Sequence, residues 1–178
     1  MSFRLLPLER AAGWDDAIAL RLNRASCCIW LRAPFQVASR LGDGVFWYAV
    51  MLALLLGAQA DAVPAVVHMI ATGLVCTAVY KWIKRKTTRP RPFETHAAIV
   101  PVDPVLDLYS FPSGHTAHAV AFTLMAVAYY PWLAWLTVPF TVMVATSRVV
   151  LGLHYPSDVL AGALLGSLIA GASLCAFP

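Results

Sequence analysis

Long apolar segments separated by short polar stretches make up most of this chain. Five of them cover residues 44–60, 63–83, 114–130, 132–149 and 156–176. Each is close to the roughly 17–25 residues that a helix needs to cross a bilayer, and a helix satisfies its own backbone hydrogen bonds in lipid. The pattern therefore predicts an all-α, integral membrane bundle of five helices that forms a single domain over residues 1–178.

The first 42 residues follow a different pattern. Between residues 14 and 40, apolar and charged positions alternate at helical spacing, and Arg32 and Pro34 lie where the centre of a span would be. This is typical of an amphipathic helix in the membrane interface. A sixth span over residues 25–41 is the alternative, and it would place Arg32 near the middle of the bilayer at a cost of about 2.5 kcal/mol or more.

Composition supports a membrane protein and argues against nucleic acid as a partner. Hydrophobic residues make up 60% of the chain, charged residues 12%, and the mean hydropathy is +0.71, whereas a typical soluble domain is about 25% charged. The formal net charge is +4. However, apolar spans separate the basic residues along the chain, whereas a nucleic-acid-binding protein usually groups them on one solvent-exposed face. An unequal distribution of charge between the two membrane faces and contacts with anionic lipid explain the basic residues better. The sequence carries no signal for an oligomeric state.

Three polar clusters lie at the ends of apolar segments. Residues 84–92 follow the second segment, residues 112–115 open the third, and residues 147–158 join the fourth to the fifth. Successive crossings place all three at the same membrane face. Because ionisable residues near hydrocarbon are costly and are normally kept there for a function, we expect one shared site.

The first cluster offers cations to an anion. Pro90 and Pro92 stop the preceding helix, so that Lys84 and Arg91 can face one pocket. Arginine presents a planar fork of donors to phosphate oxygens, and lysine presents a compact charge. The structural alternative is a basic collar, meaning solvated basic residues that surround the end of a span. We favour this alternative for Lys81, Arg85, Lys86 and Arg89.

The second cluster opens a helix. Ser113 is a plausible N-cap, and Gly114 lets a ligand approach the backbone, so the first amides of the helix make an anion site. His115 lies in the first turn, where it could protonate a leaving oxygen. A histidine that only caps the helix is the structural alternative.

The third cluster adds another cation and a histidine–carboxylate pair. Arg148 is a further phosphate fork, and Pro156 suits the first turn of a helix, so that Asp158 can reach back to His154. A carboxylate on one imidazole nitrogen fixes the tautomer and leaves the other nitrogen as a nucleophile. A buried ion pair that links two helices is the structural alternative.

Taken in order, these residues resemble the three-part signature of the type 2 phosphatidic acid phosphatase superfamily, which also includes glucose-6-phosphatases and vanadium haloperoxidases. The resemblance spans residues 84–158 and comprises Lys84, Arg91-Pro92, Pro112-Ser113-Gly114-His115, Ser147-Arg148, His154 and Asp158. It implies that His154 attacks phosphorus to form a phosphohistidine, that Asp158 orients His154, and that His115 protonates the leaving group. It also implies that no metal or cofactor is needed and that the phosphate oxygens are held by Lys84, Arg91, Ser113, the Gly114 amide and Arg148.

The function expected from this resemblance is hydrolysis of a lipid phosphomonoester or diphosphate. Phosphatidic acid, phosphatidylglycerophosphate and polyprenyl diphosphates are the candidate substrates. A phosphotransferase that uses a polyprenyl diphosphate donor would share the phosphohistidine, and a non-enzymatic anionic-lipid-binding or transport protein would share the basic pocket. The expected location is a bacterial cytoplasmic membrane. With five spans the positive charges favour a cytoplasmic site, whereas family precedent and a sixth span favour the extracytoplasmic face.

The remaining ionisable residues are weaker candidates. We expect His68 to be packed inside the second span, and His118 either to line the lipid entrance or to pack. Asp43 and Asp61 are interpreted as turn residues, and solvation is expected in the connecting loop for Glu94, His96, Asp103 and Asp107.

Overall fold

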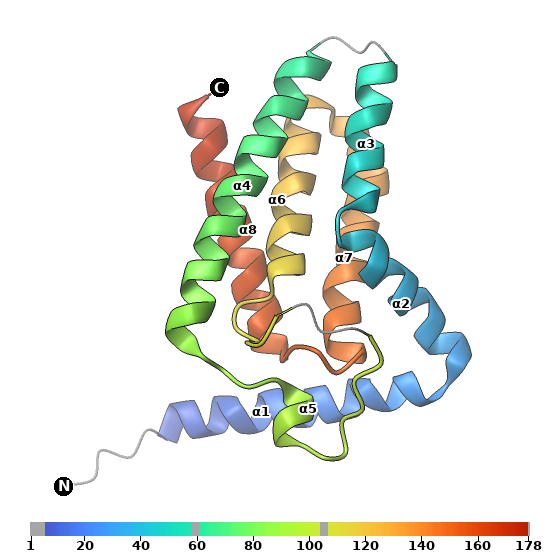
Figure 1. Cartoon of the computed structure of the whole chain (residues 1–178), viewed down its shortest axis with the longest axis vertical. Helices are drawn as coiled ribbons and strands as arrows, with labels where there is room; N and C mark the ends of the chain where they lie inside the picture. Colours follow the sequence, from blue (N-terminus) through green and yellow to red (C-terminus); the bar gives the residue numbers. More distant parts are fainter. Residues whose placement is uncertain (1–5, 58–60, 104–106, 178) are drawn as a thin grey trace, which may run out of the picture.

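The computed structural model is an all-helical bundle (Figure 1) and describes residues 6–57, 61–103 and 107–177. No strand occurs among these residues, which confirms the predicted fold class. The elements in chain order are α1 (Leu6–Asn23), a 3-10 turn (Arg24–Cys27), α2 (Ile29–Gly42), α3 (Val45–Leu56), α4 (Ala62–Thr87), α5 (Pro92–Thr95), α6 (Gly114–Tyr129), a 3-10 turn (Pro131–Leu133), α7 (Ala134–Val150) and α8 (Pro156–Ala176).

Four predicted segments correspond closely to α4, α6, α7 and α8. The fifth, residues 44–60, corresponds to the shorter α3, and its residues 58–60 lie outside the described residues. By length and composition, α4 continued by α5, α7 with its preceding turn, and α8 can each cross a membrane alone, and α2 with α3, bent by 58°, would make a fourth crossing. The count of five or six spans therefore stays a prediction.

The N-terminal segment differs from the single helix expected over residues 14–40. It forms α1 and α2, with Cys28 in an extended conformation between them. The Asn23 side chain ends α1, because its amide donates to the carbonyls of Val100 and Val150 and accepts from the Val100 N–H. Ser26 then donates to the Asn23 carbonyl, which tightens the chain into the 3-10 turn.

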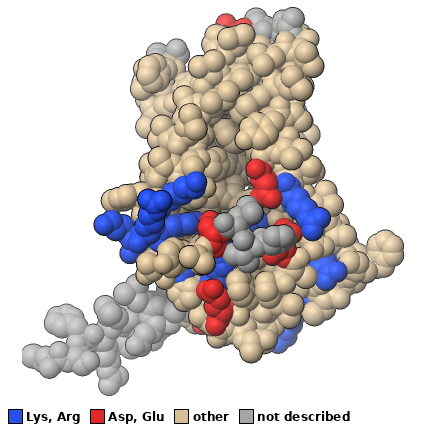
Figure 2. All heavy atoms as spheres, viewed as in Figure 1, with Lys and Arg blue, Asp and Glu red and all other residues tan. Residues whose placement is uncertain are grey.

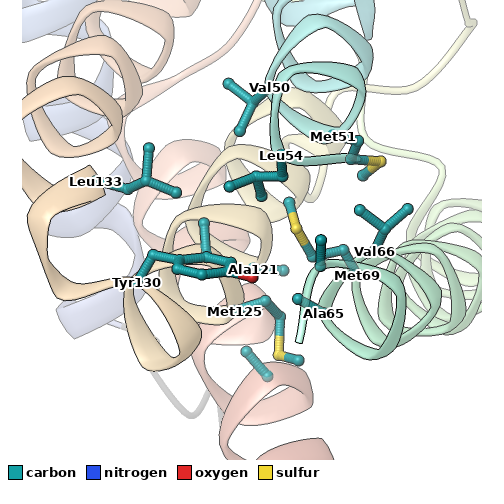
Figure 3. Close-up of a cluster of buried hydrophobic side chains, with 13 residues drawn as sticks. Val50, Met51, Leu54, Ala65, Val66, Met69, Ala121, Met125, Tyr130 and Leu133 are labelled. Carbon is teal, nitrogen blue, oxygen red and sulfur yellow. The ribbon is translucent and has the colours of Figure 1, made fainter. Parts of the chain in front are cut away.

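The main core lies between α3, α4 and α6, as the side chains in Figure 3 show. Met51 of α3, Met69 of α4 and Met125 of α6 are almost completely buried within it. On the outer side of α8, Leu160, Leu164 and Leu168 recur one turn apart and are 62–70% exposed. A repeated leucine ridge of this kind is unfavourable in water and suits hydrocarbon, in agreement with an integral membrane protein.

Close contact between α6 and α8 brings two of the polar clusters together. A side chain at Gly162 would collide with the Ser113 carbonyl, and one at Gly166 would collide with the carbonyl of Ala117. With no Cβ at these positions, the two backbones can approach closely. The Ser113 N–H donates to the Asp158 carbonyl at 3.0 Å, so the start of α6 lies directly beside the start of α8.

Candidate active site

The polar ends of α4, α6, α7 and α8 meet at one end of the bundle, drawn at the bottom of Figure 1, where α1 and α5 lie across them. Figure 2 shows Lys, Arg, Asp and Glu gathered around this end, while the rest of the drawn face carries few of them. All three predicted clusters therefore lie at the same end of the molecule.

Lys84 and Arg91 converge on one carboxylate. The ammonium of Lys84 donates to both oxygens of Asp107, at 2.7 and 2.9 Å, and to the Tyr109 carbonyl at 2.8 Å. The guanidinium of Arg91 donates to Asp107 Oδ1 at 2.7 Å and to the Leu153 carbonyl at 2.7 Å. Both cations are buried, and the structure brings them together around Asp107.

The expectation that Asp107 is merely solvated is wrong. Burial alone would raise the pKa of its carboxyl, but the hydrogen bond and charge of Lys84, together with Arg91, hold that pKa below its ordinary value. Asp107 is therefore ionised at neutral pH. Its carboxylate takes hydrogen bonds from Lys84 and Arg91 that were expected to bind phosphate oxygens.

The start of α6 has the predicted cap and an unpredicted acidic partner. Ser113 is fully buried, and its hydroxyl oxygen accepts from the Thr116 N–H. Gly114 and His115 follow, and Nε2 of His115 is bonded to a carboxylate oxygen of Asp43. Asp43 lies in the turn between α2 and α3, as expected, but its carboxylate also orients the His115 ring through this bond.

His154 lies on the loop between α7 and α8 and is buried. Its Nδ1 is 3.6 Å from Asp158 Oδ2, and its Nε2 is 3.5 Å from Nη1 of Arg91. The structure thus brings the pair together, but at a separation too long for a full hydrogen bond. Burial lowers the pKa of His154 well below its ordinary value, and the charges of Arg148, Arg91 and Lys84 lower it further, so the imidazole is neutral at pH 7.

Arg148 reaches the same region from the end of α7. Its Nη1 donates to the Ser39 hydroxyl at 2.6 Å, and that hydroxyl donates to Asp103 at 2.6 Å. Its buried Nε has no hydrogen-bond partner among the described residues. Arg148 thus keeps a donor free, and Asp103, expected to be solvated, instead supports it through Ser39.

The assignment of Arg89 to a solvated collar is also wrong. Its guanidinium donates to Asp158 Oδ1 at 2.7 Å, to the Ser157 hydroxyl at 2.8 Å and to Asp15 Oδ2 at 2.9 Å. It also lies over the Tyr155 ring at 4.2 Å. The other three residues of that collar, Lys81, Arg85 and Lys86, are exposed as expected.

Two further loop residues have specific partners instead of being merely solvated. Glu94 accepts from the Arg91 N–H at 2.7 Å, and His96 pairs with Asp16 at 2.8 Å. The buried His68 contacts Tyr129 and Ser173, in agreement with packing inside the span. None of these three is part of the polar group around His154.

A cavity of about 460 Å³ adjoins this group between α3, α4 and α6. Asp107, Gly114 and His115 line its polar end, and its apolar part includes Trp47, Met51, Ile70 and Phe122. His118 lines the cavity. It is also packed in place, because its ring nitrogens contact the carbonyls of Gly114 and Gly73. The cavity therefore combines a polar end with an apolar interior, which suits an amphipathic molecule.

Among the described residues, no group of three or more His, Cys, Asp or Glu side chains is arranged to hold a metal ion.

Comparisons with known proteins give a consistent result. The sequence model of the PAP2 superfamily matches residues 61–178. The undecaprenyl-diphosphatase BcrC of Bacillus subtilis is 30% identical over 127 residues, which cover 71% of this chain and 65% of that protein. The decaprenylphosphoryl-5-phosphoribose phosphatase of Mycobacterium tuberculosis is 43% identical over 101 residues, or 56% of this chain and 54% of that protein. The chain thus spans about half to two thirds of these relatives.

A solved structure supports the same fold. The transmembrane PAP2-type phosphatidylglycerolphosphate phosphatase from Bacillus subtilis superimposes with a TM-score of 0.67, covering 93% of this chain and 85% of the other, at 23% sequence identity.

Proposed function

The chain belongs to the PAP2 superfamily, and from this membership and its polar site we propose that it is a membrane-bound lipid phosphatase. The reaction would be hydrolysis of a lipid phosphomonoester or diphosphate. The observation that carries the proposal is the position of Arg91, which is bonded to Asp107 at the polar end of the cavity and is 3.5 Å from Nε2 of His154. A phosphate in place of the Asp107 carboxylate would therefore lie beside a neutral, buried imidazole.

In the proposed mechanism, Nε2 of His154 attacks phosphorus while the bond from phosphorus to the leaving oxygen breaks. His115 gives its proton to that oxygen. Water then attacks the phosphohistidine, His115 takes a proton from this water, and inorganic phosphate leaves with His154 restored. Asp158 stabilises the positive charge that develops on the imidazole.

The phosphate-binding groups would act mainly on the charge of the transition state. Lys84, Arg91 and Arg148 supply fixed positive charge, and the start of α6 supplies the Ser113 hydroxyl and the Gly114 amide. Donors of this kind are preorganised, so they need little rearrangement when charge develops.

The substrate class that we propose first is a polyprenyl phosphate or diphosphate. Two relatives carry names that describe such substrates, an undecaprenyl-diphosphatase and a decaprenylphosphoryl-5-phosphoribose phosphatase. The apolar walls of the cavity suit a hydrocarbon chain that enters from the bilayer while the phosphate stays at the polar end. Phosphatidylglycerophosphate and phosphatidic acid are the comparison substrates.

The experiment is phosphate release from these three lipids by purified protein in detergent, measured with and without an added acceptor lipid. Release of inorganic phosphate from a polyprenyl diphosphate supports the proposal. Absence of release from all three lipids would refute it, and transfer of the phosphate to the acceptor would indicate a phosphotransferase.

We further propose a bacterial cytoplasmic membrane as the location, with the site on the extracytoplasmic face, following the family precedent. The test uses a chain in which the exposed Cys27, Cys28 and Cys175 are replaced by serine and Leu108, 77% exposed, is replaced by cysteine. A membrane-impermeant maleimide should label this cysteine in intact cells. A cysteine in place of Asp61, at the opposite end of the bundle, is the control, and labelling of that position alone would put the site in the cytoplasm.

Asp107 is expected to compete with phosphate. Because its carboxylate is bonded to Lys84 and Arg91, an incoming phosphate must displace it, and Asp107→Asn removes the competing charge. Inhibition by inorganic phosphate should then become about tenfold stronger, a change of roughly 1.4 kcal/mol. The inhibition constants of the two proteins check this, and weaker inhibition of the variant would show that Asp107 instead holds the two cations in place.

The acid side of the pH profile should reflect the low pKa of His154. We expect kcat/KM to hold as the pH falls through 6.5, the ordinary histidine value, and to decline only below it, because protonation removes the attacking lone pair. In Arg148→Gln a positive charge that opposes this protonation is gone, so the decline should begin at higher pH. Both proteins are measured with the same substrate, so the ionisation of the substrate affects the two pH profiles equally. A decline at the same or a lower pH in the variant contradicts the assignment.

A further inference from the structure

One face of α1 is buried against the segments that carry the catalytic pair. Asp15, Ala19 and Asn23 recur at four-residue spacing and are buried, while Trp14, Ile18 and Leu22 are exposed. Figure 1 shows α1 running across the end of the bundle where α7 ends and α8 begins. None of these residues belongs to the three-part signature, so the signature alone gives α1 no role.

Each buried residue of this face contacts a different segment beside the site. Asn23 bonds the Val150 carbonyl at the end of α7, and Ala19 packs in a cluster with Ile99 and Tyr155. Asp15 accepts from the Ser157 N–H at 2.9 Å, from the Ser157 hydroxyl and from Nη2 of Arg89. Asp15 therefore contacts the first turn of α8 directly.

Arg89 connects Asp15 to Asp158. Its two terminal nitrogens donate to different carboxylates, Nη2 to Asp15 and Nη1 to Oδ1 of Asp158. The other oxygen of Asp158, Oδ2, accepts from the Tyr155 N–H at 2.8 Å and faces Nδ1 of His154. Both oxygens of Asp158 are thus fixed, and one of them is fixed by a guanidinium that Asp15 holds.

From this geometry we infer that Asp15 is a positioning residue for the His154–Asp158 pair, acting through Arg89 and Ser157. The inference rests on the proposed function, because it assigns His154 as the nucleophile.

Charge gives a second reason for the role of Asp15. Asp15, Arg89 and Asp158 form a row of negative, positive and negative groups whose charges sum to −1. This row opposes the positive charges of Arg148, Arg91 and Lys84 that surround the imidazole. Without the Asp15 charge, Arg89 would neutralise Asp158. Asp158 would then stabilise the imidazolium less, because a nearby negative charge is what favours the charged imidazole.

The experiment compares Asp15→Asn with Asp16→Asn in the full-length protein. Asp16 is the matched control, because it lies on the same helix but pairs with His96 instead of with Arg89, Ser157 or Asp158. Reactions with a polyprenyl diphosphate at a concentration equal to that of the protein separate the amplitude of the first turnover, which counts active molecules, from the rate constant of the chemical step.

For Asp15→Asn we expect a rate constant lower by about 10- to 100-fold, with an unchanged amplitude and a KM within about twofold. Asp16→Asn should stay within about twofold of wild type in all three quantities, since it leaves the row of charges intact. A loss confined to the amplitude, or equal losses in the two variants, would show that Asp15 only docks α1 and would overturn the inference.

Arg89→Lys is the second variant, needed if Asp15→Asn fails to fold. It keeps the positive charge but cannot bond both carboxylates with separate nitrogens, so its rate constant should fall as in Asp15→Asn. The double variant should lose little more than either single variant, whereas multiplied losses would contradict a shared path. An inactive wild-type protein would instead refute the proposed function, and with it this role.

Discussion

Replacing His154 by glutamine should lower phosphate release by about 10⁴-fold or more, the scale seen when a catalytic nucleophile is removed. Glutamine retains polar atoms of similar reach but has no lone pair that can form a stable bond to phosphorus. The measurement is the initial rate of phosphate release from a polyprenyl diphosphate.

The matched control for this variant is His68→Gln. His68 is also a buried histidine, but its partners Tyr129 and Ser173 lie far along α6 and α8 from the ends that carry the site. Its replacement should leave the rate within about threefold of wild type. If His154→Gln retained more than about a tenth of the wild-type rate, His154 would not be the nucleophile.

Replacing His115 by asparagine should lower the rate by roughly 10²- to 10⁴-fold, the range for a general acid, and the loss should depend on the leaving group. It should be largest for an alkyl phosphomonoester, whose alkoxide needs a proton. A lipid diphosphate should lose less, and p-nitrophenyl phosphate should lose least, because its phenolate leaves without protonation. The measurement is the ratio of wild-type to variant rates for the three substrates.

Asp43→Asn provides the control for His115, since it keeps the shape of the partner but removes its charge. The asparagine can still bond Nε2 of His115 but no longer favours the protonated ring. Its losses should follow the same order across the three substrates and be smaller at each. Equal losses for all three substrates in His115→Asn would show that His115 binds phosphate rather than protonating the leaving group.

The apolar pattern predicted the helices well because long hydrophobic runs have few alternatives in a chain of this composition. The grouping of Lys84, Arg91, His115 and His154 at one end also followed from the alternation of crossings. The break between α1 and α2 did not, because it depends on hydrogen bonds from Asn23 to residues 100 and 150, which are distant in the sequence. The helical spacing of apolar and charged residues continues across the break, so no local sequence pattern indicates where α1 ends.

The acidic partners of the site were missed for the same physical reason. Asp107 lies 16 and 23 positions from the cations that it contacts, and Asp15 lies 142 positions from Ser157. A carboxylate in a polar loop is usually solvated, and no local pattern distinguishes one that is not. The pairing of Arg89 could have been suspected, because a buried Asp158 needs more than a neutral histidine to balance its charge.

The central claim is that His154 carries the phosphate during the reaction. The most direct measurement uses a polyprenyl diphosphate labelled with radioactive phosphorus on its terminal phosphate, a rapid quench in alkali, and location of the label by peptide mapping. We predict an acid-labile, alkali-stable label on the peptide that contains His154, absent from His154→Gln. Rapid hydrolysis by the wild-type protein with no label on that peptide, or with the label on another residue, would contradict the account.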